Sequence, residues 1–527
     1  MKMYSGYSVS EKKKFKIYII ILIIFSIFIN QHFANRGVFP IDSFLIFDAA
    51  NNIILGNHPF KDYWSITGPF LDYVQSLFFL VFGVNWFSYV FHASIINMLF
   101  SIFTFYFFYE IGLKKSYAFL YSLGVSILAY PSIGTPFIDH HAVILSVISI
   151  YCLSLGILTK KNIFWFLASA FLVLSFFSKQ IPSVYQLILF TIILSFYFIY
   201  LKKFNQKNII HLFLGVLSIL FFIFCVFFIN EIPLGNFLIQ YIYYPYSIGE
   251  DRIELLSLDF KNLVAQFKFI YFALIPLVIS TIILIKNKKK NKVNKQHLVI
   301  SLLFLGSVAI FIYYQLITKN QVLIFFLIPI SAAFSHFYAK KYLNKEYFIY
   351  FILIIFIFST SKYHLRFNQN KKFMELIDAD FNLAVKANQL DPRLNNLKWI
   401  TPHYSKNPSH EINLLLDAKN VLLNTDERKM IITDYQFFSS LLKNKFASPN
   451  KWYDNRSIPD KENKYYNVHK KFFFNKIKKN KIENLFFIGQ HKHKMYFFQE
   501  LISENKCITV NQPNELLVKF DISKCKF

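Results

Sequence analysis

Apolar runs of about twenty residues recur along most of this chain, with short polar segments between them. A bilayer core about 30 Å thick requires helical runs of this length. The pattern therefore predicts a polytopic α-helical membrane protein with about eleven transmembrane helices. The predicted spans are residues 17–34, 86–111, 116–131, 141–159, 162–178, 181–201, 209–230, 267–285, 297–317, 322–339 and 346–360.

Lysine clusters between the runs predict how these spans are oriented. Connections dense in Lys and Arg remain in the cytoplasm. Eleven spans place every cluster there, together with the N-terminus, and leave the C-terminus outside. No small-residue cleavage site follows the first run, so an uncleaved signal-anchor is expected. The clusters are Lys114-Lys115, Lys160-Lys161, Lys202-Lys203-Lys207, Lys286 to Lys295 and Lys340-Lys341-Lys345.

The first external loop, about residues 35–85, is long and acidic. Its segment 69–82 is apolar, but a further span there would turn the later lysine clusters outward, so an interfacial helix is predicted instead. Another helix is predicted over residues 48–55, ended by Gly56. Carboxylates close to a bilayer are costly unless they have a use. The loop carries Asp42, Asp48, Asp62 and Asp72 among aromatic residues.

The polar remainder of the chain predicts a second domain. Residues 1–364 form the transmembrane domain, and residues 365–527 are expected to form an extracytoplasmic α/β domain, because short apolar runs alternate there with helical patterns. A disulfide between Cys507 and Cys525 is left open, since it depends on this domain being outside. Strands are predicted at 430–435, 484–489 and 515–520, helices at 371–388 and 435–444, and a turn-rich loop that could cap the site at 451–466.

Charge and motif content exclude several classes of function. The net charge of +27 would favour nucleic acid in a soluble protein. Here the lysines mark topology and no nucleic-acid-binding module accompanies them, so the expected partners are membrane lipids and not nucleic acid. The sequence has no Gly-rich nucleotide loop, paired CxxC motif or nucleophile elbow. Energy or a sugar donor would have to arrive through the lipid phase.

Two acidic positions are candidates for chemistry. Asp42 follows Pro40 at the start of the external loop, and it is either the N-cap of the next helix or a general base at the membrane boundary. Asp139 lies between the third and fourth spans, beside His140 and His141. It either caps the fourth span, with the histidines at the interface, or belongs to a metal-ligand set.

Isolated basic residues on the external side are candidates for binding an anion. Lys179 and Lys319 each lie between two spans joined by a very short external connection. A lysine fixed there suits a phosphate headgroup, and the alternative is snorkelling from the end of a span. Arg252 lies in the longer external loop 231–266.

In their order along the chain, these residues resemble a family. One span is followed by Pro40-Ile41-Asp42 and Gly56-Asn57-His58-Pro59-Phe60, then by Gly68-Pro69, with Asp139 and Lys179 at later span ends. This resembles the GT-C fold glycosyltransferases that use lipid-linked sugars, such as aminoarabinose transferases of lipid A and protein O-mannosyltransferases. The resemblance covers about residues 15–340. The chain departs from the family where Asp42-Ser43 replaces an Asp-Glu pair.

The resemblance implies an inverting transfer of a sugar from a polyprenyl-phosphate carrier. The acceptor would be lipid A, another glycan or a protein at the outer face of a bacterial inner membrane. Asp42 would be the base, and Asp139 would orient the acceptor or hold a divalent ion with His140; no cofactor is otherwise expected. Phosphate ligands would be Lys179, Lys319 and Arg252, and acceptor or support residues would be Asp48, Asp62, His140 and His141.

Two other functions are compatible with the pattern. A lipid-linked polysaccharide polymerase or ligase would use the same kind of donor, but such enzymes rely on arginines in a late external loop, and here that loop offers Arg252 alone. A glycolipid transporter or flippase would show repeated halves and charges near mid-membrane. This chain shows no internal repeat and keeps its charges at span ends.

Overall fold

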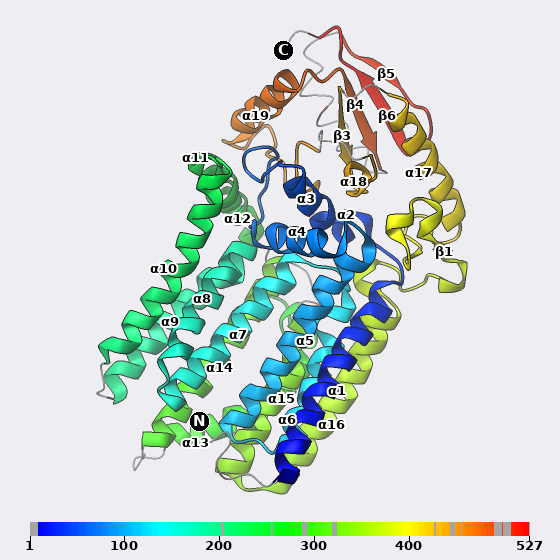
Figure 1. The fold of residues 1–527 in the computed structure, drawn as a ribbon. Helices are drawn as coiled ribbons and strands as arrows, with labels where there is room; N and C mark the ends of the chain where they lie inside the picture. The colour runs from blue at the N-terminus through cyan, green and yellow to red at the C-terminus, as the bar shows by residue number, and fades with distance from the viewer. Residues whose placement is uncertain are drawn as a thin grey trace.

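The structure is a bundle of long helices that carries a mixed α/β domain at one end, with the two termini toward opposite ends (Figure 1). It is a computed structural model. It describes residues 9–201, 205–254, 256, 258–286, 292–318, 324–425, 428–442, 448–454, 456–489, 498 and 507–525.

A helix overlaps each of the predicted spans. Within the described ranges, eight helices are long and apolar enough to cross a membrane, so the chain is an integral membrane protein. Three further helices at predicted spans are shorter, and the total of eleven spans stays a prediction. The eight are α1 (Val9–Ala34), α5 (Trp86–Ile111), α7 (Ile138–Thr159), α9 (Gln180–Leu201), α10 (Gln206–Ile229), α13 (Lys268–Lys286), α14 (Lys292–Thr318) and α16 (Glu346–Tyr363), and the shorter three are α6 (Lys115–Leu128), α8 (Asn162–Ser178) and α15 (Leu327–Tyr338).

Three connections that carry lysine pairs lie at the same end of the bundle. Asp139 at the start of α7 pairs with Lys179 just after α8, so the connection between these helices, with Lys160 and Lys161, lies at the opposite end. The α5–α6 and α15–α16 connections also lie away from the α/β domain (Figure 1). We call the end that carries the α/β domain the domain end, and the other the lysine end.

Three helices of the first loop lie across the domain end (Figure 1): α2 (Pro40–Ser43), α3 (Leu45–Ile54) and α4 (Phe70–Phe82). The two helices predicted in this loop correspond to α3 and α4. Pro69 is the N-cap residue of α4, and its ring fixes φ at −82°, close to the helical value. Its side chains Leu77, Leu80 and Val81 are 60–72% exposed, which fits a helix that lies against lipid.

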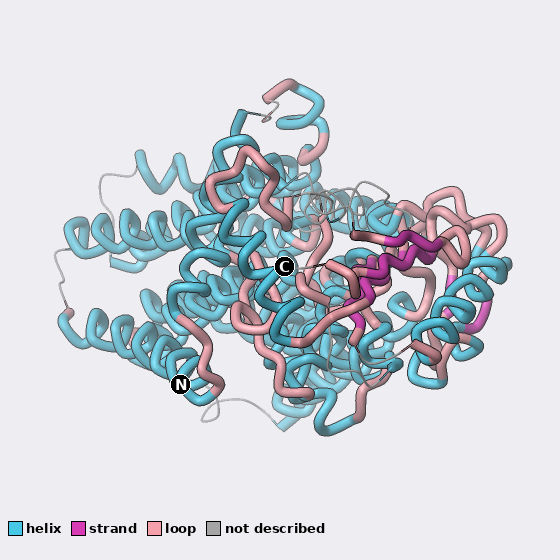
Figure 2. Tube along the Cα trace, turned by 90° about the horizontal axis from the view of Figure 1, so that it is seen from above, coloured by secondary structure: helices cyan, strands magenta, loops and turns pink. Residues whose placement is uncertain are grey.

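The C-terminal domain contains a four-stranded sheet in the order β3-β4-β6-β5. Strands β3 and β4 are parallel, and the other pairs are antiparallel. The sheet lies over one side of the bundle (Figure 2). The three predicted strands are confirmed. The elements are β3 (Lys429–Thr433), β4 (Asn484–Ile488), β5 (Thr509–Asn511), β6 (Leu517–Asp521), α17 (Pro408–Leu423), α18 (Phe438–Leu442) and α19 (Tyr466–Lys479).

Short elements complete the chain. They are α11 (Leu234–Phe237), α12 (Tyr244–Glu254), β1 (Val385–Lys386), β2 (Lys398–Trp399), the π-helical turns η2 (Leu238–Tyr243), η3 (Lys261–Ala265), η5 (Ala339–Leu343) and η6 (His364–Gln369), and the 3-10 turns η1 (Tyr130–Ser132), η7 (Lys372–Met374), η8 (Phe381–Leu383), η9 (Ala387–Gln389) and η10 (Pro392–Leu394).

The helix predicted over residues 371–388 is wrong. Lys371 and Glu375 have φ of +46° and +57°, in the left-handed region that a helix cannot contain. The apolar residues Met374 and Leu376 pack with Ile400 in a small core of their own. The spacing of apolar residues was misleading here, because apolar side chains that cluster around a turn can repeat at a helical interval over a few residues. The helix predicted at 435–444 corresponds in part to α18.

Backbone contacts fix the C-terminal domain to the first loop. The N–H of Trp64 donates to Pro449 O at 2.8 Å, and the N–H of Lys451 donates to Trp64 O at 2.9 Å. The Lys451 ammonium pairs with the Asp72 carboxylate of α4 at 2.6 Å, and both side chains are buried. A buried pair of this kind depends on both partners remaining in place. The domain is therefore held in one position over the loop.

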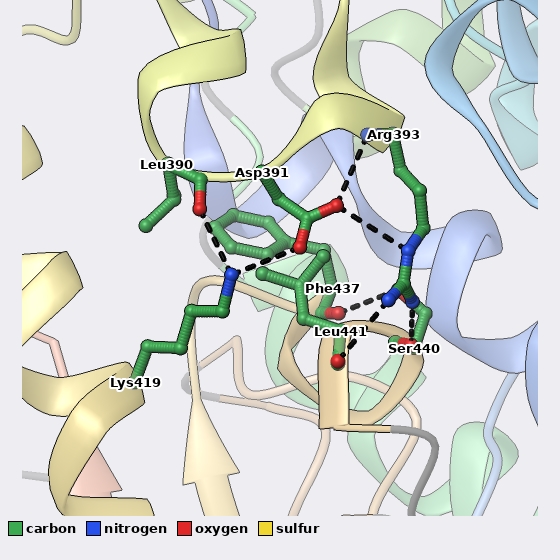
Figure 3. A network of polar contacts seen from close by, with 7 residues as sticks. All are labelled: Leu390, Asp391, Arg393, Lys419, Phe437, Ser440 and Leu441. Carbon is green, nitrogen blue, oxygen red and sulfur yellow. Dashed lines mark hydrogen bonds and ion pairs between the residues drawn. The ribbon is translucent and has the colours of Figure 1, made fainter. Parts of the chain in front are cut away.

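A polar network connects the turn around Asp391 to α17 and α18 (Figure 3). Asp391 Oδ2 accepts a hydrogen bond from Lys419 Nζ at 2.9 Å, and Asp391 Oδ1 lies 3.3 Å from Arg393 Nε. Arg393 in turn donates to the carbonyl oxygens of Ser440 and Leu441 in α18.

The disulfide left open by the sequence is present in the same domain, between Cys507 and Cys525.

Asp48 of α3 is buried against the C-terminal domain and accepts a hydrogen bond from Ser439 of α18. Burial raises the pKa of Asp48 to about 7, from an ordinary value of 3.8. Between these values the folded protein holds a proton that the unfolded chain has released, so stability falls as the pH rises from about 4 to 7 and is level above 7.

We therefore expect Asp48→Asn to reduce this pH dependence. The amide oxygen still accepts from Ser439, and the variant gains up to about 4 kcal/mol relative to the wild type at pH 8, as an upper bound. Thermal unfolding of both proteins at pH 5 and pH 8 measures this. Equal pH slopes in the two proteins would contradict the assignment to Asp48.

Candidate active site

A cavity of about 900 Å³ opens at the domain end of the bundle. Helices α2, α9, α12 and α14 contribute to its wall, together with residues 66 and 67 of the first loop and 452 and 454 of the C-terminal domain. Most of the lining is apolar, which favours an amphipathic ligand. The polar lining residues are Asp42, Thr67, Lys179, Gln180, Tyr185, Tyr246, Tyr314, Thr318 and Asp454.

Asp42 lines this cavity from α2. The N-cap position of α2 is Phe39 and that of α3 is Phe44, and neither helix has a side-chain cap among the described residues. The N–H of Phe39 instead donates to Ser43 Oγ at 3.0 Å. Interpreting Asp42 as a helix N-cap is therefore wrong. The short helix places its carboxylate at the cavity wall.

Lys179 lies in extended backbone between α8 and α9 and also lines the cavity. Its ammonium pairs with the carboxylate of Asp139, which is fully buried at the start of α7. The hydroxyl of Tyr314 donates to the same carboxylate oxygen, and the Lys179 Nζ lies 5.7 Å from the centre of the Tyr314 ring. The α8–α9 connection, α7 and α14 therefore fix one cation at the wall. Asp139 is not itself a lining residue and contacts the cavity through Lys179.

Gly68 allows the first loop to approach this lysine. Its N–H donates to Ser178 O at 3.2 Å, and a Cβ at this position would lie 1.8 Å from Phe177 O. Only glycine fits at such a distance from another backbone. The residue preceding Pro69 thus packs directly against the turn that carries Lys179.

Gly68→Ala is accordingly expected to displace the end of α8. A small-to-large change in a packed site costs about 1–3 kcal/mol, and the displaced Lys179 should bind its ligand less well. Thermal unfolding and the activity assay described below measure the two effects. Gly235→Ala is the matched control, because nothing lies within 4 Å of a Cβ there. If both variants resemble the wild type, the close approach is unimportant.

The other acidic candidates lie outside the cavity lining. Asp48 faces α18, as described above. Asp62 accepts the N–H of His58 at 2.9 Å and closes a turn in the first loop. These two residues therefore support the loop and its contact with the C-terminal domain.

The histidines beside Asp139 face other partners. His140 Nε2 lies 2.8 Å from Ala129 O, whereas His141 contacts Tyr130 and lies 3.2 Å from His92, Nε2 to Nε2. In the part of the chain that the structure describes, no group of three His, Cys, Asp or Glu side chains is placed to hold a metal ion. The metal-ligand reading of Asp139 and His140 does not fit this arrangement.

Two predicted phosphate ligands cannot be placed. Lys319 lies outside the described residues, and the side chain of Arg252 does too. Their neighbours Thr318 and Ile253 line the cavity.

Several lining residues were not predicted. Tyr314 lies in a predicted span, where the apolar pattern hides a single polar position, and Gln180 follows Lys179 in the short connection between two predicted spans. Gln180 Nε2 donates to Ile66 O at 3.1 Å and so fixes the adjacent wall. Trp452 and Asp454 come from the C-terminal domain, within the loop that the sequence suggested as a cap. The turn-rich composition of that loop was the only signal for them.

The cavity wall continues into a lipid-facing surface on α9. Val184 lines the cavity and is 39% exposed. Farther along the same face, Ile188 and Ile192 are 53% and 60% exposed. Residues four apart share one side of a helix, so this apolar stripe leads from the cavity toward the lysine end.

Comparisons with known proteins give a limited result. No protein-family model matches the sequence, and no curated protein sequence matches it. Among solved structures, ArnT from Cupriavidus metallidurans bound to undecaprenyl phosphate has a TM-score of 0.48 at 10% identity, with 95% of this chain and 97% of that chain covered. The apo state of ArnT has a TM-score of 0.42 at 10% identity, with 97% and 98% covered. At these values, function must be inferred from the residues of this chain.

Proposed function

We propose that this chain is an inverting GT-C type glycosyltransferase that moves a sugar from a polyprenyl-phosphate carrier to an acceptor hydroxyl. One observation carries the proposal: a carboxylate, Asp42, and a fixed cation, Lys179, line the same largely apolar cavity at the domain end. A general base and a phosphate-binding cation are the two groups that such a transfer needs.

The donor fits the cavity by its two chemical parts. Its polyprenyl tail would follow the exposed apolar stripe of α9, and its phosphate would contact Lys179. Because Asp139 and Tyr314 already hold the lysine, little entropy is lost when the phosphate binds. Lys319 and Arg252 are proposed as further phosphate ligands, since their chain neighbours line the cavity.

The transfer is a single displacement. Asp42 takes the proton of the acceptor hydroxyl while the acceptor oxygen forms a bond to the anomeric carbon. The bond from that carbon to the phosphate oxygen breaks, and its electron pair leaves with the polyprenyl phosphate. The leaving phosphate gains one negative charge, which Lys179 stabilises. No step is assigned to a metal ion, because the side chains of Asp139 and His140 face different partners.

The acceptor would approach from the C-terminal domain. Trp452 and Asp454 line the cavity from that side. An aromatic face and a carboxylate suit a polyhydroxylated group, which leaves a glycan, a lipid-borne sugar or a protein as possible acceptors. We place this face outside a bacterial inner membrane. The lysine clusters at the opposite end and the disulfide in the C-terminal domain support that orientation.

The test is transfer of labelled sugar by the purified protein in lipid nanodiscs. Polyprenyl-phosphate sugars serve as donors, and a membrane extract of the source cell supplies the acceptor. We expect protein-dependent transfer of one sugar per acceptor. Long polymeric products would indicate a polymerase or ligase. Movement of the lipid across vesicles without any transfer, for all donors, would contradict the enzymatic proposal.

A further inference from the structure

Four basic side chains gather at the domain end of α1, away from the cavity. They are His32 in the last turn of that helix, Arg36 two residues beyond its end, Lys371 after α16, and Lys398 in β2. Backbone pairing places Lys398 beside Arg36: the Gly37 N–H donates to Lys398 O and the Lys398 N–H donates to Asn35 O, both at 3.0 Å. The charged neighbours of His32 are Arg36, Lys371 and Lys398, and that of Lys371 is Arg36. All of these neighbours are positive. We call the four residues the basic cluster.

Lys371 is the unusual member of the basic cluster. Its side chain is fully buried, and its ammonium has no hydrogen-bond partner in the parts of the chain that the structure describes. Burying an ammonium without a partner is costly, and so is placing it beside a guanidinium. An anion beside such an ammonium would stabilise its charged form, and the described residues provide no hydrogen-bonding partner there.

The surface below the basic cluster indicates where that ion comes from. On α1, Ile20, Ile24 and Phe28 are 54%, 64% and 69% exposed, and their four-residue spacing continues to His32. On α16, Ile354 and Phe358 are 65% and 55% exposed. Apolar stripes of this kind face lipid tails. The basic cluster lies where these stripes end, at the domain end of the bundle, which is the level of headgroup phosphates.

We infer that the basic cluster is a binding site for a phosphate group. Lys371 would be the buried donor, Arg36 would supply the paired N–H groups that match phosphate oxygens, and His32 and Lys398 would form the rim. The Arg36 guanidinium is already oriented, 4.8 Å above the ring of Phe381. The phosphate belongs either to a membrane lipid headgroup or to free inorganic phosphate.

The basic cluster is separate from the cavity. None of its members is among the lining residues. Phe137, which lines the cavity, packs on Phe373 at 5.8 Å between ring centres, and Phe373 follows Lys371 by two residues. The proposed phosphate would therefore bind on the other side of an aromatic layer. This inference does not depend on the proposed glycosyltransferase activity.

The experiment is native mass spectrometry of the full chain with added phosphatidylglycerol, diacylglycerol or inorganic phosphate. Phosphatidylglycerol and diacylglycerol both carry acyl chains, but only the first has a phosphate. We expect wild type to bind phosphatidylglycerol at least about tenfold more tightly than diacylglycerol, and Lys371→Met to lose that preference. Binding of inorganic phosphate without any lipid preference would identify the free ion as the ligand.

Controls make the inference falsifiable. Lys372→Met removes an exposed lysine next to Lys371 and should bind as the wild type does. If Lys371→Met fails to fold, Arg36→Gln and Lys398→Gln remove charge nearer the surface and should each weaken binding several-fold. Wild type that binds diacylglycerol as tightly as phosphatidylglycerol and ignores inorganic phosphate would overturn the site. Variants that bind phosphate as tightly as wild type would do the same.

Discussion

Asp42→Asn is expected to reduce kcat for sugar transfer by about 10²–10⁴-fold, the usual contribution of a general base. Asparagine has the same shape as aspartate but cannot accept the acceptor proton. Because asparagine keeps this shape and the side chain caps neither α2 nor α3, the thermal unfolding curve of the variant should stay close to that of the wild type. The donor-binding affinity should also be retained, since Lys179 is untouched.

The matched control is Asp417→Asn, which removes an exposed carboxylate from α17 of the C-terminal domain. This variant should transfer sugar at the wild-type rate. Full activity in Asp42→Asn would move the base elsewhere, and Asp454 would be the next candidate because it lines the same cavity. Loss of activity together with loss of folding would leave the role of Asp42 to be tested with Asp42→Glu.

The membrane part of the fold was predictable because a single physical requirement governs it. Lipid forces each spanning segment to pair its own backbone groups, so apolar length translates directly into helices. The helices at 86–111 and 162–178 have the predicted bounds. In the C-terminal domain, Lys371 and Glu375 adopt left-handed backbone that packing alone determines, and the periodic pattern failed there.

The site was predictable in part, and for a similar reason. Asp42 and Lys179 are charged residues next to long apolar runs, where few charges occur without a use. Tyr314 and Trp452 carry no such signal, since aromatic residues are abundant throughout the chain at 20% of the total. Only the fold shows that they share a cavity.

The histidine pair shows a limit of arguing from adjacency. Successive residues of a helix point about 100° apart. The hydrogen-bonding partners differ accordingly: His140 Nε2 contacts Ala129 O, His141 contacts the Tyr130 hydroxyl, and Asp139 pairs with Lys179. Three ligand-type residues in a row therefore do not form one metal site when they begin a helix.

Lys179→Met is expected to lower kcat by about 10²–10³-fold, because the leaving phosphate loses the cation that stabilises its growing charge. It should also destabilise the protein by about 3–5 kcal/mol, since the buried Asp139 loses its cationic partner. Lys61→Met is the control. It removes a lysine from the same end of the bundle, where the exposed pair with Glu231 contributes little to stability.

These two effects separate when Asp139→Asn is added to Lys179→Met. The second change removes the uncompensated charge, so thermal unfolding should return toward that of the wild type. Transfer should stay as low as in Lys179→Met, because the cation is still missing and Asp139 acts only through it. A double variant that regains activity would mean that Lys179 serves the fold alone. A stable, inactive double variant would assign the lysine to the chemistry.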